Sequence, residues 1–119
     1  PNNEHVLNNY SYFLCLRKQQ LLKAQGMAKK LINKYPEKGT YLDTYGWVLY
    51  MMKQYEEAEI YLRKAALLEE NGTVIEHYGD VLFELGQFKK ALVQWRRAQE
   101  LGGATDSIGL KIKNNEAHD

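Results

Sequence analysis

Residues 40–68 read TYLDTYGWVLYMMKQYEEAEIYLRKAALL, and residues 73–101 repeat the pattern as TVIEHYGDVLFELGQFKKALVQWRRAQEL. At a spacing of 33 residues, the two segments place small, aromatic and aliphatic residues in the same order, as in the pairs Tyr45-Gly46/Tyr78-Gly79, Leu49/Leu82, Ala58/Ala91 and Ala65/Ala98. Self-similarity at this period is typical of stacked helical hairpins, in which one repeat alone cannot bury its apolar face. The repeat therefore predicts a helical-repeat array.

A third, weaker copy precedes these two. Its first half lies 35 residues before the second copy, as Ser11 before Gly46 shows, whereas its second half lies 34 residues before, as Ala24 before Ala58 shows. The difference of one residue predicts an extra residue in the turn near residues 18–20. We expect a single domain over residues 1–119, with repeats at about residues 4–37, 39–71 and 72–104.

The apolar residues inside each repeat step by three and four, which is the spacing of an amphipathic helix. We predict helices at residues 4–17, 20–34, 40–52, 55–69, 73–85, 88–101 and 105–114, and a frayed tail at 115–119. Thr40 with Asp43 and Thr73 with Glu76 have the spacing of capping boxes at two helix starts.

Small residues at matched positions predict how the two helices of a hairpin cross. Glycine inside a helix costs about 1 kcal/mol relative to alanine, so Gly46 and Gly79 indicate a close approach of two helices. We expect Ala58 and Ala91 to lie opposite them, and Leu62 and Trp95 to fill the gaps between hairpins.

Composition excludes several classes of protein. The chain is 45% apolar and 26% charged with a net charge of +1, as in an ordinary globular domain without a global attraction to nucleic acid. It has no apolar run of about 18 residues, so no membrane insertion is expected. The single cysteine, Cys15, excludes an internal disulfide.

The repeats resemble the tetratricopeptide repeat (TPR), whose pattern of about 34 residues contains a bulky residue, Leu-Gly or a similar pair, a Tyr, then Ala, an aromatic residue, Ala and Pro. Glu70 and Gly103 stand where the family often has Pro. The matching residues are Tyr45-Gly46, Tyr78-Gly79, Ala58, Ala91, Ala65 and Ala98. Lys53 departs from the pattern, because Gly is common at that position and Gly86 keeps it. The resemblance implies an all-α, right-handed solenoid of three helix–turn–helix hairpins, closed by a capping helix at residues 105–114. We expect the chain to be the C-terminal part of a longer TPR protein.

In the family, the first helix of each hairpin lines a concave groove that holds a peptide of a partner. The first-helix segments 40–52 and 73–85 contain acidic residues and no Lys or Arg, whereas the second helices carry most of the basic residues. We read these bases as a solvated convex face rather than a nucleic-acid surface. The groove is then expected to be acidic and aromatic, with Asn8, Tyr12, Asp43, Trp47, Tyr50, Glu76, Asp80 and Phe83 as its binding residues. The alternative is that Trp47 and Tyr50 pack against neighbouring helices and expose only their edges.

Other chemistry finds little support in the sequence. His5, His77 and His118 match no zinc spacing, and no metal, cofactor or catalytic residue is expected. Glu76, His77 and Asp80 lie near one helix face, which we read as polar groove residues rather than an acid–base site. Some TPR domains hold a terminal carboxylate with Lys, Asn and Arg, but here the matching positions carry Tyr12, Trp47 and Asp80 besides Asn9.

We therefore predict a protein–protein interaction module, not an enzyme, that binds a basic–apolar peptide segment through aromatic and charged contacts. The alternative is a structural spacer or self-association segment that closes a larger repeat array. The sequence leaves the localisation and the identity of the partner unknown.

Overall fold

The computed structural model describes residues 3–17 and 20–116. These residues form seven α-helices. They are α1 (Glu4–Leu16), α2 (Leu21–Lys34), α3 (Gly39–Met51), α4 (Tyr55–Leu68), α5 (Gly72–Glu84), α6 (Phe88–Leu101) and α7 (Ile108–Asn115). No strand occurs among the described residues. The extra turn residue expected near 18–20 falls largely on residues 18–19, outside the described part, and most of the tail, including His118, lies outside it as well.

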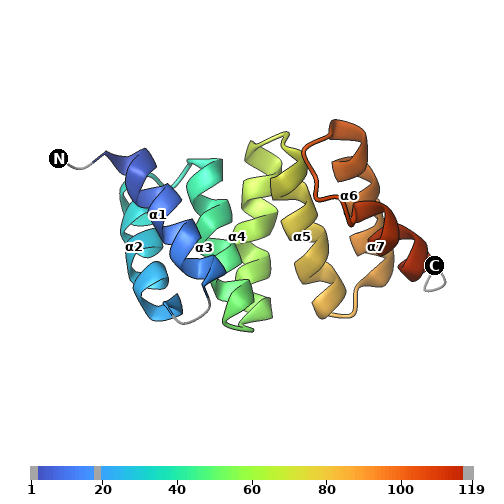
Figure 1. The fold of residues 1–119 in the computed structure, drawn as a ribbon, viewed down its shortest axis with the longest axis horizontal. Helices are drawn as coiled ribbons and strands as arrows, with labels where there is room; N and C mark the ends of the chain where they lie inside the picture. Colours follow the sequence, from blue (N-terminus) through green and yellow to red (C-terminus); the bar gives the residue numbers. More distant parts are fainter. Residues whose placement is uncertain (1–2, 18–19, 117–119) are drawn as a thin grey trace.

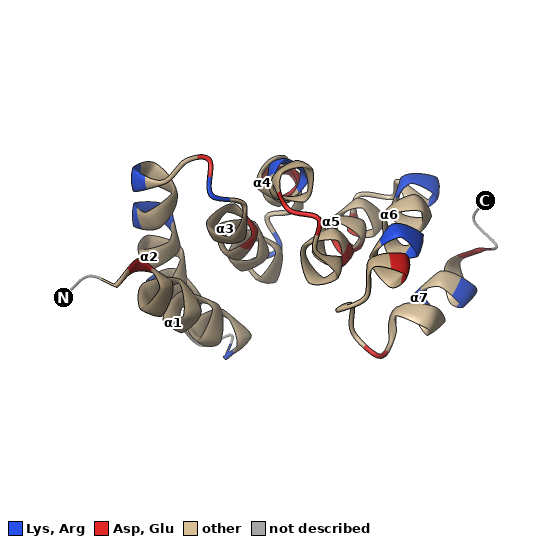
Figure 2. Cartoon of the chain, turned by 90° about the horizontal axis from the view of Figure 1, so that it is seen from above, with Lys and Arg blue, Asp and Glu red and all other residues tan. Residues whose placement is uncertain are grey.

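The helices pair as three hairpins, α1–α2, α3–α4 and α5–α6, that stack along the long axis of the molecule (Figure 1). Seen from above, α2, α4 and α6 lie on one side of the row and α1, α3, α5 and α7 on the other, with α1 and α7 at its two ends (Figure 2). Each second helix packs against the first helix of the next hairpin, α2 on α3 and α4 on α5. The all-α array of three hairpins with a capping helix is therefore confirmed.

The hairpins cross closely at the glycine positions. A Cβ atom on Gly46 would lie 2.7 Å from Leu62 Cδ2, and one on Gly79 would lie 2.5 Å from Trp95 Cδ1, so neither position has room for a side chain. The residues nearest to the glycines are thus Leu62 and Trp95 rather than Ala58 and Ala91. Leu62 and Trp95 were expected between hairpins, but they fill the crossing inside each hairpin because the glycines leave space for larger side chains. In the first hairpin, Ser11 donates a hydrogen bond to the Ala24 carbonyl at 2.8 Å and the side chain of Ser11 is buried.

The turns inside the second and third hairpins share one backbone geometry. Lys53 and Gly86, which are 33 residues apart, both have positive φ angles, of 64° and 78°. In both turns the following N–H donates back to the helix, from Gln54 to Leu49 and from Gln87 to Leu82, each at 2.9 Å. Lys53 therefore holds a left-handed conformation that glycine adopts at lower energy.

The predicted capping boxes are wrong. α3 and α5 begin one residue earlier than predicted, at Gly39 and Gly72, so that Thr40 and Thr73 lie inside the first turn. The N-cap of α5 is Asn71, whose Oδ1 accepts the Thr73 and Val74 N–H groups at 2.9 and 3.1 Å. Lys38 at the start of α3 provides no side-chain cap. Asp43 and Glu76 are consequently free to bind residues of the next unit.

The last helix closes the apolar end of the array. Ile108 and Ile112 of α7 are buried in one cluster with Leu82, Leu92 and Trp95. α7 begins at Ile108 rather than at residue 105, because Thr105 is held on Glu76 and the Thr105 carbonyl accepts the Ile108 N–H in a turn. Within the described residues, no helix has the length and apolar character needed to cross a bilayer.

Substituting the crossing glycines tests this packing. Gly46→Leu and Gly79→Leu should each lower the free energy of unfolding by about 1–3 kcal/mol, because an added side chain must displace Leu62 or Trp95. Chemical denaturation followed by circular dichroism measures the change. Gly26→Ala is the matched control: a Cβ there meets nothing within 4 Å, so this helical site should gain up to about 1 kcal/mol. Unchanged stability in both leucine variants would contradict the assigned crossing.

Removal of the capping helix should destabilise the array. A chain that ends at residue 104 exposes Leu92 and Trp95 and removes the partners of Glu76, and apolar ends of repeat arrays promote aggregation. We expect a lower melting temperature and aggregates in size-exclusion chromatography. Ile112→Ala, which keeps the polar contacts of α7, should show part of the loss. A monomeric truncated chain with the melting temperature of the full chain would refute the capping role. Leu101, at the end of α6, is 44% exposed and is not part of the apolar cluster that α7 covers.

Candidate functional site

The eight predicted site residues occupy repeated positions on the first helices. Asn8, Asp43 and Glu76 share one position, Tyr12, Trp47 and Asp80 share the next turn, and Tyr50 and Phe83 share the turn after it. All lie on α1, α3 or α5, and we call the side of the array that these helices form with α7 the inner face (Figure 2). α3 and α5 carry acidic residues and no Lys or Arg, whereas α2, α4 and α6 each carry Lys or Arg (blue in Figure 2).

Aromatic rings form a stack in the middle of the inner face. The Trp47 ring lies 3.9 Å from the His77 ring and 4.3 Å from the Tyr50 ring, nearly parallel to both at 17° and 7°. Tyr12 lies at the edge of the stack, 6.3 Å from His77. Trp47, Tyr50 and Tyr12 are partly buried, so they keep some exposed surface while they pack on each other. The stack joins α1, α3 and α5 into one platform.

Asp43 is tied to the next hairpin. Its Oδ1 lies 2.9 Å from Nδ1 of His77, and both side chains are buried. Burial disfavours the charged imidazole, but the carboxylates of Asp43, Asp80 and Glu76 together outweigh burial and raise the pKa of His77, with Asp43 contributing most. The pair therefore fixes the orientation of the imidazole on which Trp47 stacks.

Glu76 and Asp80 are tied to the capping segment. The Glu76 carboxylate accepts the Thr105 N–H at 2.7 Å, the Thr105 hydroxyl at 2.6 Å and the Lys111 ammonium at 2.6 Å. Asp80 accepts the same ammonium at 2.9 Å and the Trp95 indole N–H at 3.0 Å. Lys111 thus sits between two buried carboxylates and holds α7 against the inner face.

The electrostatics of this cluster follow from burial and from these bonds. Burial opposes ionisation of Glu76, but hydrogen bonds from Lys111 and Thr105 outweigh it and keep the pKa of Glu76 below its usual value. Burial raises the pKa of Asp80 in spite of the ammonium. The two carboxylates in turn raise the pKa of Lys111, so the ammonium stays charged.

An open pocket lies next to the ion pair of Asp80 and Lys111. It has a volume of about 240 Å³ and is lined by Tyr50, Phe83, Trp95, Asp80, Glu84, Lys111 and Asn115. Glu84 is exposed. The centre of the Phe83 ring lies 5.2 Å from that of Phe88 and 5.7 Å from that of Trp95. The pocket therefore combines aromatic walls with an exposed carboxylate.

The first hairpin contributes less to the site. Asn8 is partly buried, and its Oδ1 accepts no hydrogen bond from the described residues. Cys15, at the position of Tyr50 and Phe83, is fully buried, and burial raises the pKa of its thiol to about 12. The inner face therefore changes from neutral and apolar at α1 to acidic at α5.

Several residues of the cluster did not stand out in the sequence. Lys111 and Thr105 lie at least 25 residues beyond Glu76 and Asp80, in a segment where only the apolar spacing of Ile108 and Ile112 carries a signal. The sequence predicts His77 as a polar groove residue and Asp43 as a cap and a groove residue, but it does not predict that the two pair with each other. The described residues contain no group of His, Cys, Asp and Glu side chains that could hold a metal ion.

Comparison with known proteins gives a consistent fold. No protein-family model matches the sequence, and no curated protein matches it either. Among solved structures, the TPR domain of OM64 from Arabidopsis matches with a TM-score of 0.85 and 20% identity over 100% of both chains. The Sgt2 TPR domain from Aspergillus fumigatus matches with a TM-score of 0.85 and 15% identity over 99% of this chain and 80% of that one.

A third match is the type III secretion chaperone SycD of Yersinia enterocolitica, solved in complex with a peptide of the translocator YopD. The TM-score is 0.81 and the identity 14%, over 99% of this chain and 95% of that one. Together with the hairpin geometry and the repeat period, these likenesses show that the chain has the fold of the tetratricopeptide-repeat domains.

Proposed function

We propose that the chain is a protein-interaction module that binds a peptide segment of a partner protein on its inner face. The observation that carries the proposal is the aromatic platform of Tyr12, Trp47 and Tyr50, which is partly exposed on a side of the array that three helices share. Partly exposed aromatic residues on a concave surface are frequent anchors of binding energy. The SycD structure, which has the same fold, contains a peptide of its partner.

The charges of the inner face favour a basic–apolar peptide. Four carboxylates, of Asp43, Glu76, Asp80 and Glu84, stand against the ammonium of Lys111 and the imidazole of His77. Even with a protonated imidazole, the cluster keeps a net negative charge. Because Asp43, Glu76 and Asp80 are already paired within the chain, they act on a ligand mainly through this field, whereas exposed Glu84 can contact a Lys or Arg directly.

Two substitutions separate the aromatic contribution to peptide binding from the electrostatic one. Trp47→Ala should weaken binding of short peptides that alternate Leu or Phe with Lys or Arg by at least about 2 kcal/mol, as at a hot spot. Glu84→Gln should weaken binding more at low salt than at high salt, because an exposed charge is screened. Fluorescence anisotropy of labelled peptides measures both effects.

Trp47→Phe, which keeps an aromatic ring, and peptides with Glu in place of Lys and Arg are the controls. Tighter binding of the acidic peptides would contradict the proposed charge preference. If no peptide binds the wild-type chain, the inner face has no binding role, and the reading as a structural spacer or self-association segment takes its place.

The stability of the platform should depend on pH through His77. Since Asp43 raises the folded-state pKa of His77 above the usual value of about 6.5, its stabilisation is complete below that value. The stabilisation is then lost as the pH rises through the folded-state pKa. The free energy of unfolding should fall over this window, and Asp43→Asn, which keeps an oxygen acceptor but no charge, should flatten the dependence. Denaturation at a series of pH values measures it; an equal slope in the variant would show that the pair does not carry the effect.

A further inference from the structure

The outer side of α1 carries an exposed apolar stripe. Val6, Tyr10 and Phe13 follow each other at intervals of four and three residues and therefore lie on one side of the helix. They are 60%, 43% and 50% exposed. The Lys23 ammonium lies 5.6 Å from the centre of the Tyr10 ring, and the Arg17 guanidinium lies 5.7 Å from that of Phe13.

The repeats show what normally covers this stripe. The equivalent residues of α3, found 35 positions later, are Tyr41, Tyr45 and Val48, which are only 1%, 3% and 0% exposed. They are buried with residues of the preceding hairpin, mainly of α2: Val48 with Ala24, and Tyr41 and Tyr45 with the cluster that includes Ala28, Leu31 and Ile32. The matching residues of α5 are Val74, Tyr78 and Val81, which pack in the same cluster as the buried residues of α4. The α1 stripe thus has the shape of a surface that a second helix covers.

The two internal junctions also define the polar contact of the covering helix. Burial raises the pKa of Tyr45 and of Tyr78; side-chain hydrogen bonding to Gln25 of α2 partly offsets the first shift, whereas that to Glu59 of α4 adds to the second. Gln25 and Glu59 are equivalent residues, 34 positions apart. By the same geometry, Tyr10 is placed to meet a Gln or Glu between the small and aliphatic residues of a covering helix.

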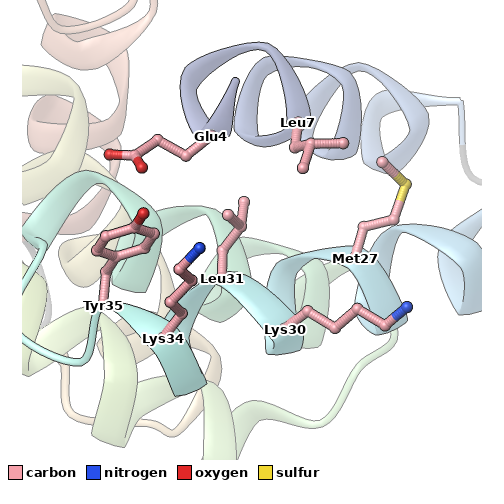
Figure 3. Close-up of a pocket in the computed structure, with 7 residues that line it drawn as sticks. All are labelled: Glu4, Leu7, Met27, Lys30, Leu31, Lys34 and Tyr35. Carbon is pink, nitrogen blue, oxygen red and sulfur yellow. The ribbon is translucent and has the colours of Figure 1, made fainter. Parts of the chain in front are cut away.

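A pocket between α1 and α2 adds a charge preference. It has a volume of about 380 Å³ and is lined by Leu7, Met27, Leu31 and Tyr35, by Lys30 and Lys34 of α2, and by Glu4 of α1 (Figure 3). Over the described residues 3–35, only Glu4 and five basic residues carry formal charge; the bases are Arg17, Lys23, Lys29, Lys30 and Lys34. This end of the array therefore favours an acidic partner.

A second copy of the chain fits this surface poorly. Stacking of α6 from one copy on α1 of another requires displacement of α7, which covers Leu92 and Trp95. Packing of α1 on α1 brings two lysine-rich rims together, and like charges at an interface are unfavourable.

We propose that the α1 stripe (Val6, Tyr10 and Phe13) and the pocket between α1 and α2 bind an amphipathic, acidic helix of a partner protein, which takes the place that the second helix of a preceding repeat would occupy. The helix places small and aliphatic side chains on Val6 and Phe13, a Glu or Gln against Tyr10, and carboxylates near Lys30 and Lys34. This surface lies at the end of the array and is independent of the inner face.

The chain itself supplies the probe. The α4 sequence, residues 55–68, covers the equivalent face of α5, so a synthetic peptide of this segment with Arg63→Glu and Lys64→Glu is a matched acidic helix. A side-chain staple keeps it helical, because isolated helices of this length are marginal in water. The α2 sequence, residues 21–34, stapled in the same way, offers the same type of surface with four lysines and no acidic residue.

Binding of labelled peptides to the full chain is measured by fluorescence anisotropy. The acidic α4 peptide should bind at least tenfold more tightly than the α2 peptide at low salt. Phe13→Asp should weaken its binding at least tenfold. Val93→Asp, at an apolar site of α6 that is 59% exposed, should leave it unchanged. Circular dichroism verifies that the variants fold, and Tyr10→Lys replaces Phe13→Asp if that variant does not.

Three results would overturn the proposal: no binding of the acidic peptide, equal binding of the α2 peptide, or equal binding to the Phe13→Asp and wild-type chains. A dimer of the wild-type chain in light scattering that Phe13→Asp dissociates would assign the stripe to a second copy instead.

Discussion

The close crossing of the two helices in each hairpin is the constraint on which the rest of the array depends. At Gly46 and Gly79 the absence of a side chain lets Leu62 and Trp95 pack directly on the first helix. In a densely packed interior, the separation of the two helix axes at this crossing sets the angle between the helices. That angle in turn sets the direction of the next hairpin. Trp95 shows the consequence, because its ring fills the crossing while its N–H reaches Asp80 on the inner face.

A second regularity joins successive units. Asp43 and Glu76 occupy the same repeat position, and each accepts hydrogen bonds from the unit that follows, Asp43 from His77 and Glu76 from Thr105 and Lys111. Buried carboxylates are costly unless they are paired, so these contacts favour one register of the stack. Asn8 is the equivalent residue in the first repeat, and it carries no charge. The Asn8 amide oxygen has no donor among the described residues, so the polar tie made by Asp43 and Glu76 is absent at this position of the first repeat.

The sequence predicted the helices well because the period repeats and because the breaks fall at Gly, Asn and Pro residues. Six helices begin and end within one residue of the predicted bounds, and α7 differs because Thr105 binds Glu76 before the helix starts. The roles of Asp43 and Glu76 could not be derived locally. The spacing from Thr40 and Thr73 suggested caps, whereas the partners lie about one repeat later in the chain. Pairing of this kind is set by the stacking of units, which the linear pattern does not encode.

The pairing changes how the inner face can recognise a ligand. Because Lys111 neutralises part of the charge of Glu76 and Asp80, the electric field at this end of the inner face is weaker than the sequence suggests. In the proposed binding mode, the aromatic platform therefore provides most of the binding energy. At the α1 end the basic residues are in excess, since Lys30 and Lys34 line the pocket with Glu4 as its one acidic residue. The two surfaces therefore differ in both sign of charge and sensitivity to salt. Under the two proposals, a partner that joins an acidic helix to a basic extended segment contacts both surfaces, and the distance from α1 to the pocket lined by Asp80 and Lys111 sets the length of the connecting segment.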